Sequence, residues 1–388
     1  MAARIMTPAL TKDVVSGTHR LVSPETTLAR ITPHLPRFGI TRCADITGLD
    51  CIGIPVYVAV RPQGRILQTS NGKGLRHVDA QVSAHMEAIE AWHAENPATV
   101  FRRASTIELR RAGEPFLSPR TLEGHTGATQ AGPGLILDWV AGEALSTGQP
   151  IWIPAFAAYY YRHQLHRYSF NGLASGNHIV EARLHGLYEI IERDTLARLS
   201  VRGQVQRSRF GVIDLETIDD DAAGALCERI RRAGLTLVLL RVAIDLPTHT
   251  FMAVLLDPSP FGHASMVNLG AGTHLSPTVA AVRAITEAAQ SRLTFIHGSR
   301  EDLPEQAYRG GTPHAALTAF FGGLLADTRW CELDDHASED LAEDLARALA
   351  TLRSLRLPDA FAVDVSQPGV DIYVAKMLVP GARCPQWI

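Results

Sequence analysis

The sequence predicts an α+β fold in which antiparallel β-hairpins pack against long helices. Three stretches, residues 39–62, 234–258 and 357–380, share a pattern of strand, polar turn and a second strand that ends at proline. A fourth hairpin is expected over residues 135–159, where Ser146-Thr147-Gly148-Gln149-Pro150 supplies the turn. Hairpins that recur along one chain are typical of antiparallel sheets covered by helices.

Long helical patterns lie between the hairpins, where apolar residues return every three or four positions. We expect helices at about 79–95, 177–199, 217–233, 277–296 and 337–355. Asp79 precedes the first of these, and Ser276 with Pro277 provides an N-cap followed by proline at the first helical position of the fourth. No low-complexity linker divides the chain. We therefore predict an N-terminal extension over 1–19, one main domain over 20–305 and a C-terminal α/β continuation of that domain over 306–388.

Composition limits the classes of partner. The 388 residues are 46% hydrophobic, which is enough for a buried core, and 37 basic residues against 40 acidic ones give a formal net charge of -3. Such a charge gives no general attraction to nucleic acid or to anionic membranes, and we expect neither as a partner. No apolar run is long enough for a membrane span and the N-terminus lacks the apolar core of a secretory signal, so we expect a cytoplasmic protein. The five cysteines form no CxxC pair and predict neither a zinc knuckle nor a disulfide framework.

The first candidate site lies on the helix expected at 79–95. Ser83, Glu87 and Glu90 are spaced by four and three residues, which places them on one face of that helix, beside an apolar face. Two carboxylates at the edge of a core can face a cation. A solvated acidic face is the alternative interpretation, because surface glutamates are common.

A second polar line follows on the helix expected at 177–199. Asn177, Glu181, His185, Glu189 and Glu192 step by four, four, four and three residues, and both flanks of the line are apolar. Glutamates stacked in this way repel one another, and in a buried helix the cost reaches several kcal/mol unless a cation compensates. Magnesium that bridges carboxylate and phosphate oxygens would supply that charge.

Arginines offer a structural alternative for this second line. Arg183, Arg193 and Arg198 lie on the same helix and could neutralise the glutamates as ion-pair partners. Calcium is a poorer candidate than magnesium, since no segment resembles an EF-hand loop.

The third candidate line mixes charges. Arg283, Glu287 and Gln290 step by four and three residues on the helix expected at 277–296, and a glycine-rich loop precedes that helix. The positive end of a helix dipole after such a loop suits an anion. An ordinary Arg283–Glu287 ion pair is the alternative.

A polar glycine loop also precedes the first line, and Lys73 within it indicates a phosphate contact. The loop is not a Walker A motif, because Leu67 stands where that motif requires glycine, so a nucleotide site here must follow another design. A plain surface turn is the alternative. His163 and His166 have the spacing of metal ligands but lack an evident third ligand, and contact with a peptide is the better interpretation.

These motifs together resemble the YcaO family in order and spacing. The resemblance covers most of the chain and is carried by residues 71–74, 83–90, 174–194, 282–293 and 298–303. Residues 17–55 look especially like the family members that accompany TfuA proteins. The resemblance implies ATP and Mg²⁺ as cofactors, a precursor peptide as substrate and a homodimer.

The resemblance also implies roles for individual residues. The implied magnesium ligands are Glu87, Glu90, Glu181, Glu189, Glu192 and Glu287. Ser83, Asn177 and Gln290 would support these ligands. Lys73, Arg193 and Arg283 would neutralise phosphate charge, and Arg20 and Ser23 would close over the nucleotide.

The chemistry implied by the resemblance is attack of a nucleophile on a backbone amide carbon, phosphorylation of the amide oxygen and loss of phosphate. Side-chain nucleophiles give azolines, external sulfide gives a thioamide and an amine gives an amidine. Azoline-forming members often end in a PxPxP tail and rely on a leader-binding domain, whereas only Pro380 and Pro385 lie near this C-terminus and no fused domain is evident. We therefore expect thioamide formation with a TfuA-like or leader-binding partner and a sulfide donor. A non-catalytic scaffold and a metal-dependent hydrolase without ATP are the alternatives of other classes.

Overall fold

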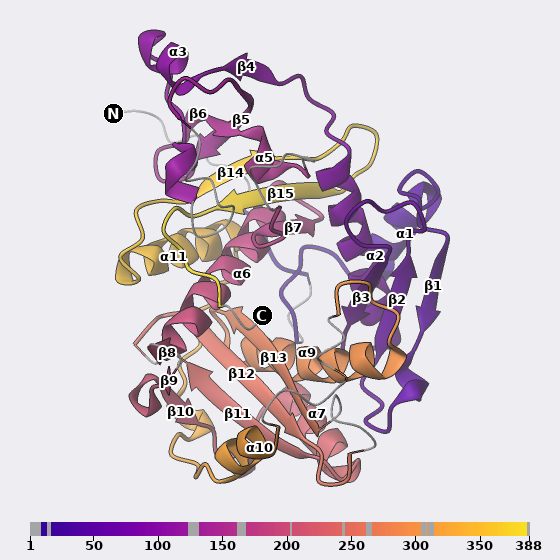
Figure 1. Cartoon of the computed structure of the whole chain (residues 1–388). Helices are drawn as coiled ribbons and strands as arrows, with labels where there is room; N and C mark the ends of the chain where they lie inside the picture. The colour runs from indigo at the N-terminus through magenta and orange to yellow at the C-terminus, as the bar shows by residue number, and fades with distance from the viewer. Residues whose placement is uncertain are drawn as a thin grey trace.

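The computed structural model describes residues 9–13, 17–122, 132–160, 168–201, 204–242, 245–260, 266–303, 308 and 314–385. Within these residues the fold is α+β, as expected, with three antiparallel sheets placed around the middle of the molecule (Figure 1). His163 and His166 lie outside the described residues.

The first sheet is three-stranded, in the order β1-β2-β3. Its strands are β1 (Arg42–Asp45), β2 (Val56–Val60) and β3 (Thr69–Lys73). The second sheet is four-stranded, in the order β10-β11-β12-β13. Its strands are β10 (Phe210–Val212), β11 (Thr236–Val242), β12 (His249–Leu256) and β13 (Val267–His274).

The third sheet is six-stranded, in the order β4-β5-β14-β15-β7, with β6 paired to β5. Its strands are β4 (Arg102–Ala104), β5 (Leu137–Ala144), β6 (Gln149–Pro154), β7 (Leu173–Gly176), β14 (Phe361–Asp364) and β15 (Tyr373–Leu378). A two-stranded ribbon is formed by β8 (Ser200–Val201) and β9 (Gln204–Val205). The C-terminal hairpin thus lies between two strands from the first half of the chain.

The helices cover these sheets. They are α1 (Pro24–Ile31), α2 (His77–Glu95), α3 (Thr106–Arg111), α5 (Ala155–Ala158), α6 (Ile179–Leu199), α7 (Asp221–Arg232), α9 (Pro277–His297), α10 (His314–Gly322) and α11 (Leu341–Ser354). Single 3-10 turns are η1 (Thr32–His34), η2 (Thr47–Leu49), η3 (Pro119–Leu122), η5 (Arg207–Arg209), η6 (Leu215–Thr217) and η8 (Trp330–Glu332).

The four expected hairpins are all present, and the expected helices are found with shifted ends. The two glycine-rich segments expected as loops before the first and fourth helices are largely strands, β3 and β13. The first long helix begins at His77 rather than after Asp79. Arg76 is the N-cap, and the Asp79 carboxylate, one turn into the helix, accepts the Arg76 amide at 3.0 Å. An acid at this position completes a capping box and complements the helix dipole. Ser276 and Pro277 begin α9 as expected.

Two units of the fold repeat the same design. In each, the last strand of an antiparallel sheet leads into a long helix that packs back on it: β3 into α2, and β13 into α9. Gly72 and Gly272 make the close approach possible. A Cβ on Gly72 would lie 2.3 Å from the Ala80 carbonyl oxygen, and one on Gly272 would lie 2.2 Å from that of Ala280. Any side chain at either position would push helix and strand apart.

A third strand-to-helix passage is built differently. Strand β7 leads into α6, but its hydrogen-bonded neighbour is β15, near the C-terminus. The apolar sides of α6 pack on this sheet and on α11, with Leu187, Ile191 and Leu352 buried between them. Consequently α2, α6 and α9 approach the middle of the molecule from three sheets (Figure 1).

No helix in the described part of the chain is long and apolar enough to cross a membrane.

Candidate active site

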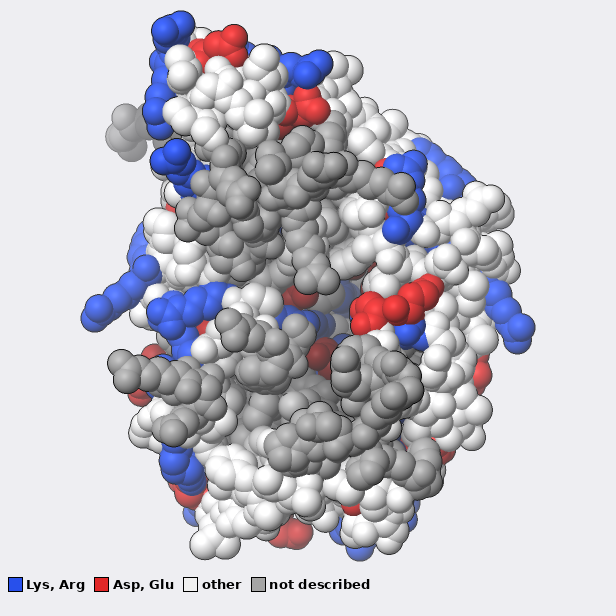
Figure 2. Space-filling model, in the orientation of Figure 1, with Lys and Arg blue, Asp and Glu red and all other residues white. Residues whose placement is uncertain are grey.

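The three polar helix faces predicted from the sequence meet at one place. Figure 2 shows a hollow near the middle of the face in view, with acidic and basic atoms inside it. Glu87 on α2 interacts electrostatically with Glu189 on α6 and Glu287 on α9, and Glu192 on α6 interacts with Glu287. Residues that are up to 200 positions apart in the sequence thus contribute to one charged cluster.

Burial and mutual repulsion make several of these carboxyl groups reluctant to ionise. Burial raises the pKa of Glu90 to about 8, although the Ser175 hydroxyl, 2.5 Å from its Oε1, acts in the opposite direction. Burial and then the charge of Glu287 raise the pKa of Glu192 to about 7. Burial raises the pKa of Glu87 to about 6. Carboxylates in this state gain stability from any cation that enters the cluster.

Lys73 joins two of the three helix-bearing units. It ends β3, and its Nζ donates to Glu287 Oε2 on α9 at 2.6 Å. Burial alone would raise the pKa of Glu287, but Lys73 and Arg193 outweigh it and hold this pKa below its ordinary value. Arg283 also lowers this pKa electrostatically, but within the described residues the direct ion-pair partner of Glu287 is Lys73 of another sheet rather than Arg283 of its own helix.

The arginines of α6 neutralise its glutamates only in part. Arg183 pairs with Glu143 and Arg198 with Asp194, neither of which belongs to the polar line. Arg193 alone of the three approaches a glutamate of that line, at 3.8 Å from Glu189 Oε1. Arg193 also interacts electrostatically with Glu192, so the structural alternative considered for this helix accounts in part for Glu189 and Glu192 and does not account for Glu181.

Glu189 and Glu181 have different surroundings. Glu189 is 25% exposed, and its Oε2 accepts the Gly172 amide at 3.2 Å. Glu181 is 3% exposed, and both of its oxygens already have donors. Its Oε1 accepts from Arg20 Nη1 at 3.1 Å, and its Oε2 accepts the Leu21 amide at 3.0 Å. Glu181 thus anchors the segment that precedes α1.

The supporting residues are placed around the cluster in different ways. Ser83 is half-buried on α2. Asn177 lies just before α6 rather than on it, and its Oδ1 accepts from Arg30 at 3.3 Å. Gln290 Nε2 donates to the Asn71 carbonyl at 3.4 Å. Ser23 caps α1, because its Oγ accepts the Thr26 amide at 3.2 Å.

Two further residues near the cluster were not singled out from the sequence. Arg300, in the motif that follows α9, interacts electrostatically with Glu87. Lys376 lies in β15, 1% exposed, and its ammonium donates to the carbonyls of Ser169 and Asn171 at 2.6 and 2.7 Å. It thereby holds the turn whose Gly172 amide reaches the α6 line. The sequence carries no signal for this role of Lys376, because a single lysine within an otherwise apolar strand belongs to no recognisable motif.

The C-terminal segment also comes to this cluster. The Arg383 amide donates to Asp194 Oδ1 on α6 at 2.9 Å. The next residue, Cys384, interacts electrostatically with Arg193 and Glu189, while partial burial raises the pKa of its thiol. Residues 383 and 384 therefore lie beside the acidic line of α6.

Comparison with known proteins assigns this arrangement to a family. The sequence profile of the YcaO cyclodehydratases, described as binding ATP and Mg²⁺, matches residues 71–383. The chain belongs to the YcaO family. Its cofactors are ATP and Mg²⁺, and its activity is ATP-dependent modification of a peptide backbone.

Relatives from several organisms match this YcaO chain over nearly its whole length. An uncharacterised protein of Mycobacterium tuberculosis is 37% identical over 384 residues, which cover 94% of this chain and 82% of the relative. A protein encoded in the tfuA 3' region of Rhizobium leguminosarum bv. trifolii is 33% identical over 379 residues, covering 95% of this chain and 89% of the relative.

Solved structures confirm the YcaO fold. The YcaO protein of Methanopyrus kandleri, bound with AMPPCP and Mg²⁺, superposes with a TM-score of 0.75 at 20% identity and covers 96% of this chain and 95% of its own. A heterocyclase in complex with substrate and cofactor gives a TM-score of 0.79 at 22% identity and 97% coverage of this chain. The present chain spans 54% of the length of that heterocyclase.

The charges of the cluster fit magnesium and a nucleotide. In the described residues, no group of three or more His, Cys, Asp or Glu side chains is arranged to hold a metal unaided. Magnesium is usually held by one or two carboxylates together with the phosphates of its substrate, so the glutamates need supply only part of its shell. Among the described residues Arg283 Nε is buried without a hydrogen-bond partner, and it is a donor suited to a phosphate oxygen.

Proposed function

We propose that this YcaO enzyme replaces a peptide-backbone amide oxygen by sulfur, giving a thioamide, together with a TfuA-type partner. The observation that carries the proposal is its similarity to the Rhizobium protein encoded beside tfuA, 33% identical over 379 residues. The sequence of residues 17–55 supports the same assignment, since it resembles the TfuA-associated members of the family.

The reaction balances with external sulfide as the nucleophile. Hydrosulfide adds to the amide carbon, the amide oxygen takes the terminal phosphoryl group, and the carbon–oxygen bond then breaks with release of phosphate. The sulfur loses its proton as the carbon–sulfur double bond forms. An amide oxygen is a poor leaving group until it carries phosphate, which is why a nucleotide is required. Magnesium bound with the nucleotide supplies neutralisation of the phosphate charge.

The residues of the cluster then divide into three roles in this proposal. Six glutamates hold or orient magnesium, namely Glu87, Glu90, Glu181, Glu189, Glu192 and Glu287. Ser83, Asn177 and Gln290 support these glutamates. Lys73, Arg193 and Arg283 balance the phosphate charge. Arg20 and Ser23 close over the nucleotide from the segment before α1.

Lys73 has the position that such a role requires. Its Nζ is 2.6 Å from Glu287, so it can share its charge between that carboxylate and a phosphate without moving to another part of the cluster. The raised pKa values of Glu90 and Glu192 mean that their buried negative charge is costly in the protein alone. A magnesium ion bound to the ionised carboxylates would offset that cost, which supports metal binding at this cluster.

Intact mass of the peptide distinguishes the possible products. We would co-express the chain with a precursor peptide, with and without a TfuA-type protein. Thioamide formation predicts a gain per site equal to sulfur minus oxygen, only with the TfuA-type protein present. A loss of one water per site would instead indicate ring closure to an azoline or attack by an amine of the peptide itself, and a gain equal to an added amine minus one water would indicate an amidine formed with that amine.

The paired variant Glu189→Gln with Glu192→Gln provides the control for these experiments. It should leave the peptide unmodified and abolish magnesium-dependent nucleotide binding. If the wild-type chain released no phosphate from ATP with peptide and partner present, a scaffold role would replace the catalytic one. If it failed to bind nucleotide in calorimetry, the metal-dependent hydrolase would be favoured.

A further inference from the structure

The segment before α1 is tied to the C-terminal part of the chain. We call residues 9–13 and 17–23 the N-terminal arm. Thr11 forms an antiparallel bridge with Asp340, just before α11. The Leu341 amide donates to the Leu10 carbonyl at 3.1 Å, and the Lys12 amide donates to the Glu339 carbonyl, also at 3.1 Å.

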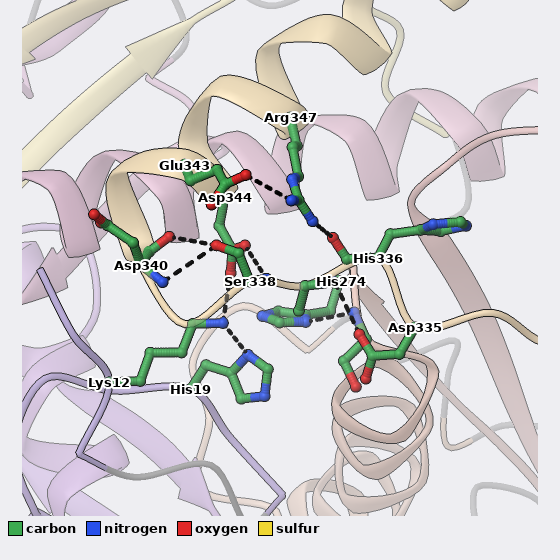
Figure 3. Close-up of polar contacts among 12 residues, drawn as sticks. Lys12, His19, His274, Asp335, His336, Ser338, Asp340, Glu343, Asp344 and Arg347 are labelled. Atoms are coloured by element: carbon green, nitrogen blue, oxygen red, sulfur yellow. Dashed lines mark hydrogen bonds and ion pairs between the residues drawn. The ribbon is translucent and has the colours of Figure 1, made fainter. Parts of the chain in front are cut away.

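A buried ion pair fixes the arm to α11. Figure 3 shows Lys12 extending from the arm toward Asp344, with the His19 ring beside its ammonium. Lys12 Nζ lies 2.7 Å from Asp344 Oδ2, and the two side chains are 1% and 0% exposed. The second oxygen of Asp344 accepts the Ser338 amide at 2.7 Å. Two opposite charges removed from water in this way hold each other in a single geometry.

The same ammonium determines the state of His19. Lys12 Nζ lies 2.8 Å from His19 Nδ1, and because an ammonium can only donate, that nitrogen accepts. Burial and then Lys12 lower the pKa of His19 to about 4, so its ring is neutral at pH 7. The ring meets His274, at the end of β13, edge to face with centroids 4.7 Å apart.

The far end of the arm reaches the acidic line of α6. The Asp13 amide donates to the Arg20 carbonyl at 2.9 Å, which ties the two described parts of the arm together. Arg20 and the Leu21 amide then occupy the two oxygens of Glu181, at 3.1 and 3.0 Å. Lys12 and Glu181 are therefore linked through one short stretch of backbone that is fixed at both ends.

We propose that Lys12 and Asp344 are positioning residues for the ATP site, because their ion pair holds the arm so that Arg20 orients Glu181. The proposal rests on the assignment of Glu181 to the magnesium-binding carboxylates. Neither Lys12 nor Asp344 touches the nucleotide in this scheme. Residues that orient a metal ligand typically contribute ten- to hundredfold to metal affinity.

The test compares two buried ion pairs. In the double variant Lys12→Met with Asp344→Leu, the charges are removed together, so neither is left buried alone. The matched control is Arg61→Met with Glu95→Leu: Arg61 Nη2 and Glu95 Oε2 are 2.6 Å apart, and the side chains are 4% and 2% exposed. This second pair ties α2 to the loop after β2, and its described hydrogen bonds go to residues outside the arm.

Calorimetry with AMPPCP over a magnesium series supplies the readout. We expect the Lys12/Asp344 variant to need about ten- to hundredfold more magnesium for half-maximal nucleotide binding. The Arg61/Glu95 variant should bind as the wild type does, whatever its melting temperature. The single variant Lys12→Arg, which keeps the charge, should recover most of the affinity.

Three results would overturn the proposal. The Lys12/Asp344 variant could bind with unchanged magnesium dependence, or the Arg61/Glu95 variant could weaken as much, which would show a general loss of packing. The third is unchanged binding by Glu181→Gln, which would remove Glu181 from the metal site. Since binding and not product is measured, none of these results depends on whether the enzyme makes a thioamide.

Discussion

Replacing Glu192 by glutamine tests whether the ionised carboxylates of the cluster lower the free energy of unfolding when no cation is bound. Glu192 is 4% exposed, and burial followed by the charge of Glu287 raises its pKa from 4.5 to about 7. A carboxyl group with a raised pKa binds its proton more tightly in the folded chain than in the unfolded one. The free energy of unfolding therefore falls as the pH rises from about 4.5 to about 7 and stays low above that.

The size of the effect follows from the shift. Each pKa unit corresponds to 1.36 kcal/mol, so ionising Glu192 costs the folded protein roughly 3 kcal/mol. Glutamine resembles the protonated acid and avoids this cost. At pH 8 and without magnesium, Glu192→Gln should unfold with a free energy about 3 kcal/mol higher than the wild type, and near pH 4.5 the difference should vanish.

Urea denaturation in chelating buffer between pH 5 and pH 8 measures this difference. Adding magnesium and AMPPCP should then stabilise the wild type and leave Glu192→Gln unchanged. Glu339→Gln, at an exposed position before α11, is the matched control and should follow the wild type throughout. A variant that is less stable than the wild type at pH 8, or equally stabilised at pH 5 and pH 8, would refute the reasoning.

Four other substitutions have definite expected outcomes. Gly72→Ala should lower stability by about 1–3 kcal/mol in urea denaturation, because its Cβ would lie 2.0 Å from the Ala84 amide nitrogen, whereas Gly224→Ala, with open space around it, should raise stability by about 0.5–1 kcal/mol. Lys73→Met removes the partner of Glu287 and should weaken AMPPCP binding at least about tenfold in calorimetry, and unchanged affinity would exclude a phosphate contact. Lys376→Met removes the donor that holds the turn before β7, and it should raise the magnesium concentration needed for half-maximal AMPPCP binding about tenfold. An unchanged magnesium dependence would show that Lys376 does not support the magnesium site.

Local patterns in the sequence predicted most of the fold. The hairpins and long helices followed from apolar periodicity and from signals such as Ser276-Pro277. Strands β3 and β13 were predicted as loops, because their glycines and polar residues are typical of turns. Strand β7 was not predicted either, because its four residues, Leu173–Gly176, carry no alternation and its partner β15 lies about 200 residues further on. Pairing over such a separation leaves no mark in a local window.

The candidate site was predicted as separate helix faces and not as a set of contacts. The four- and three-residue steps placed Glu87 on one helix face and Glu287 on another, without deciding whether either face is exposed. Only the fold shows that both glutamates belong to one cluster. The contact between Lys73 and Glu287 joins two sheets, and the contact between Arg20 and Glu181 joins the arm to α6. Such partners are set by tertiary packing, which the spacing along one helix does not contain.

The two strand-to-helix units described above bear on how the cluster is composed. From Gly72 to Ser83, Glu87 and Glu90, the intervals are the same as from Gly272 to Arg283, Glu287 and Gln290. The two units therefore carry polar side chains at equivalent positions along their helices. One unit holds two carboxylates and the other holds a cation, a carboxylate and an amide. Exchanging the side chains of Ser83 and Arg283, which occupy equivalent positions, would move a positive charge from α9 to α2 while the total charge of the site stays the same.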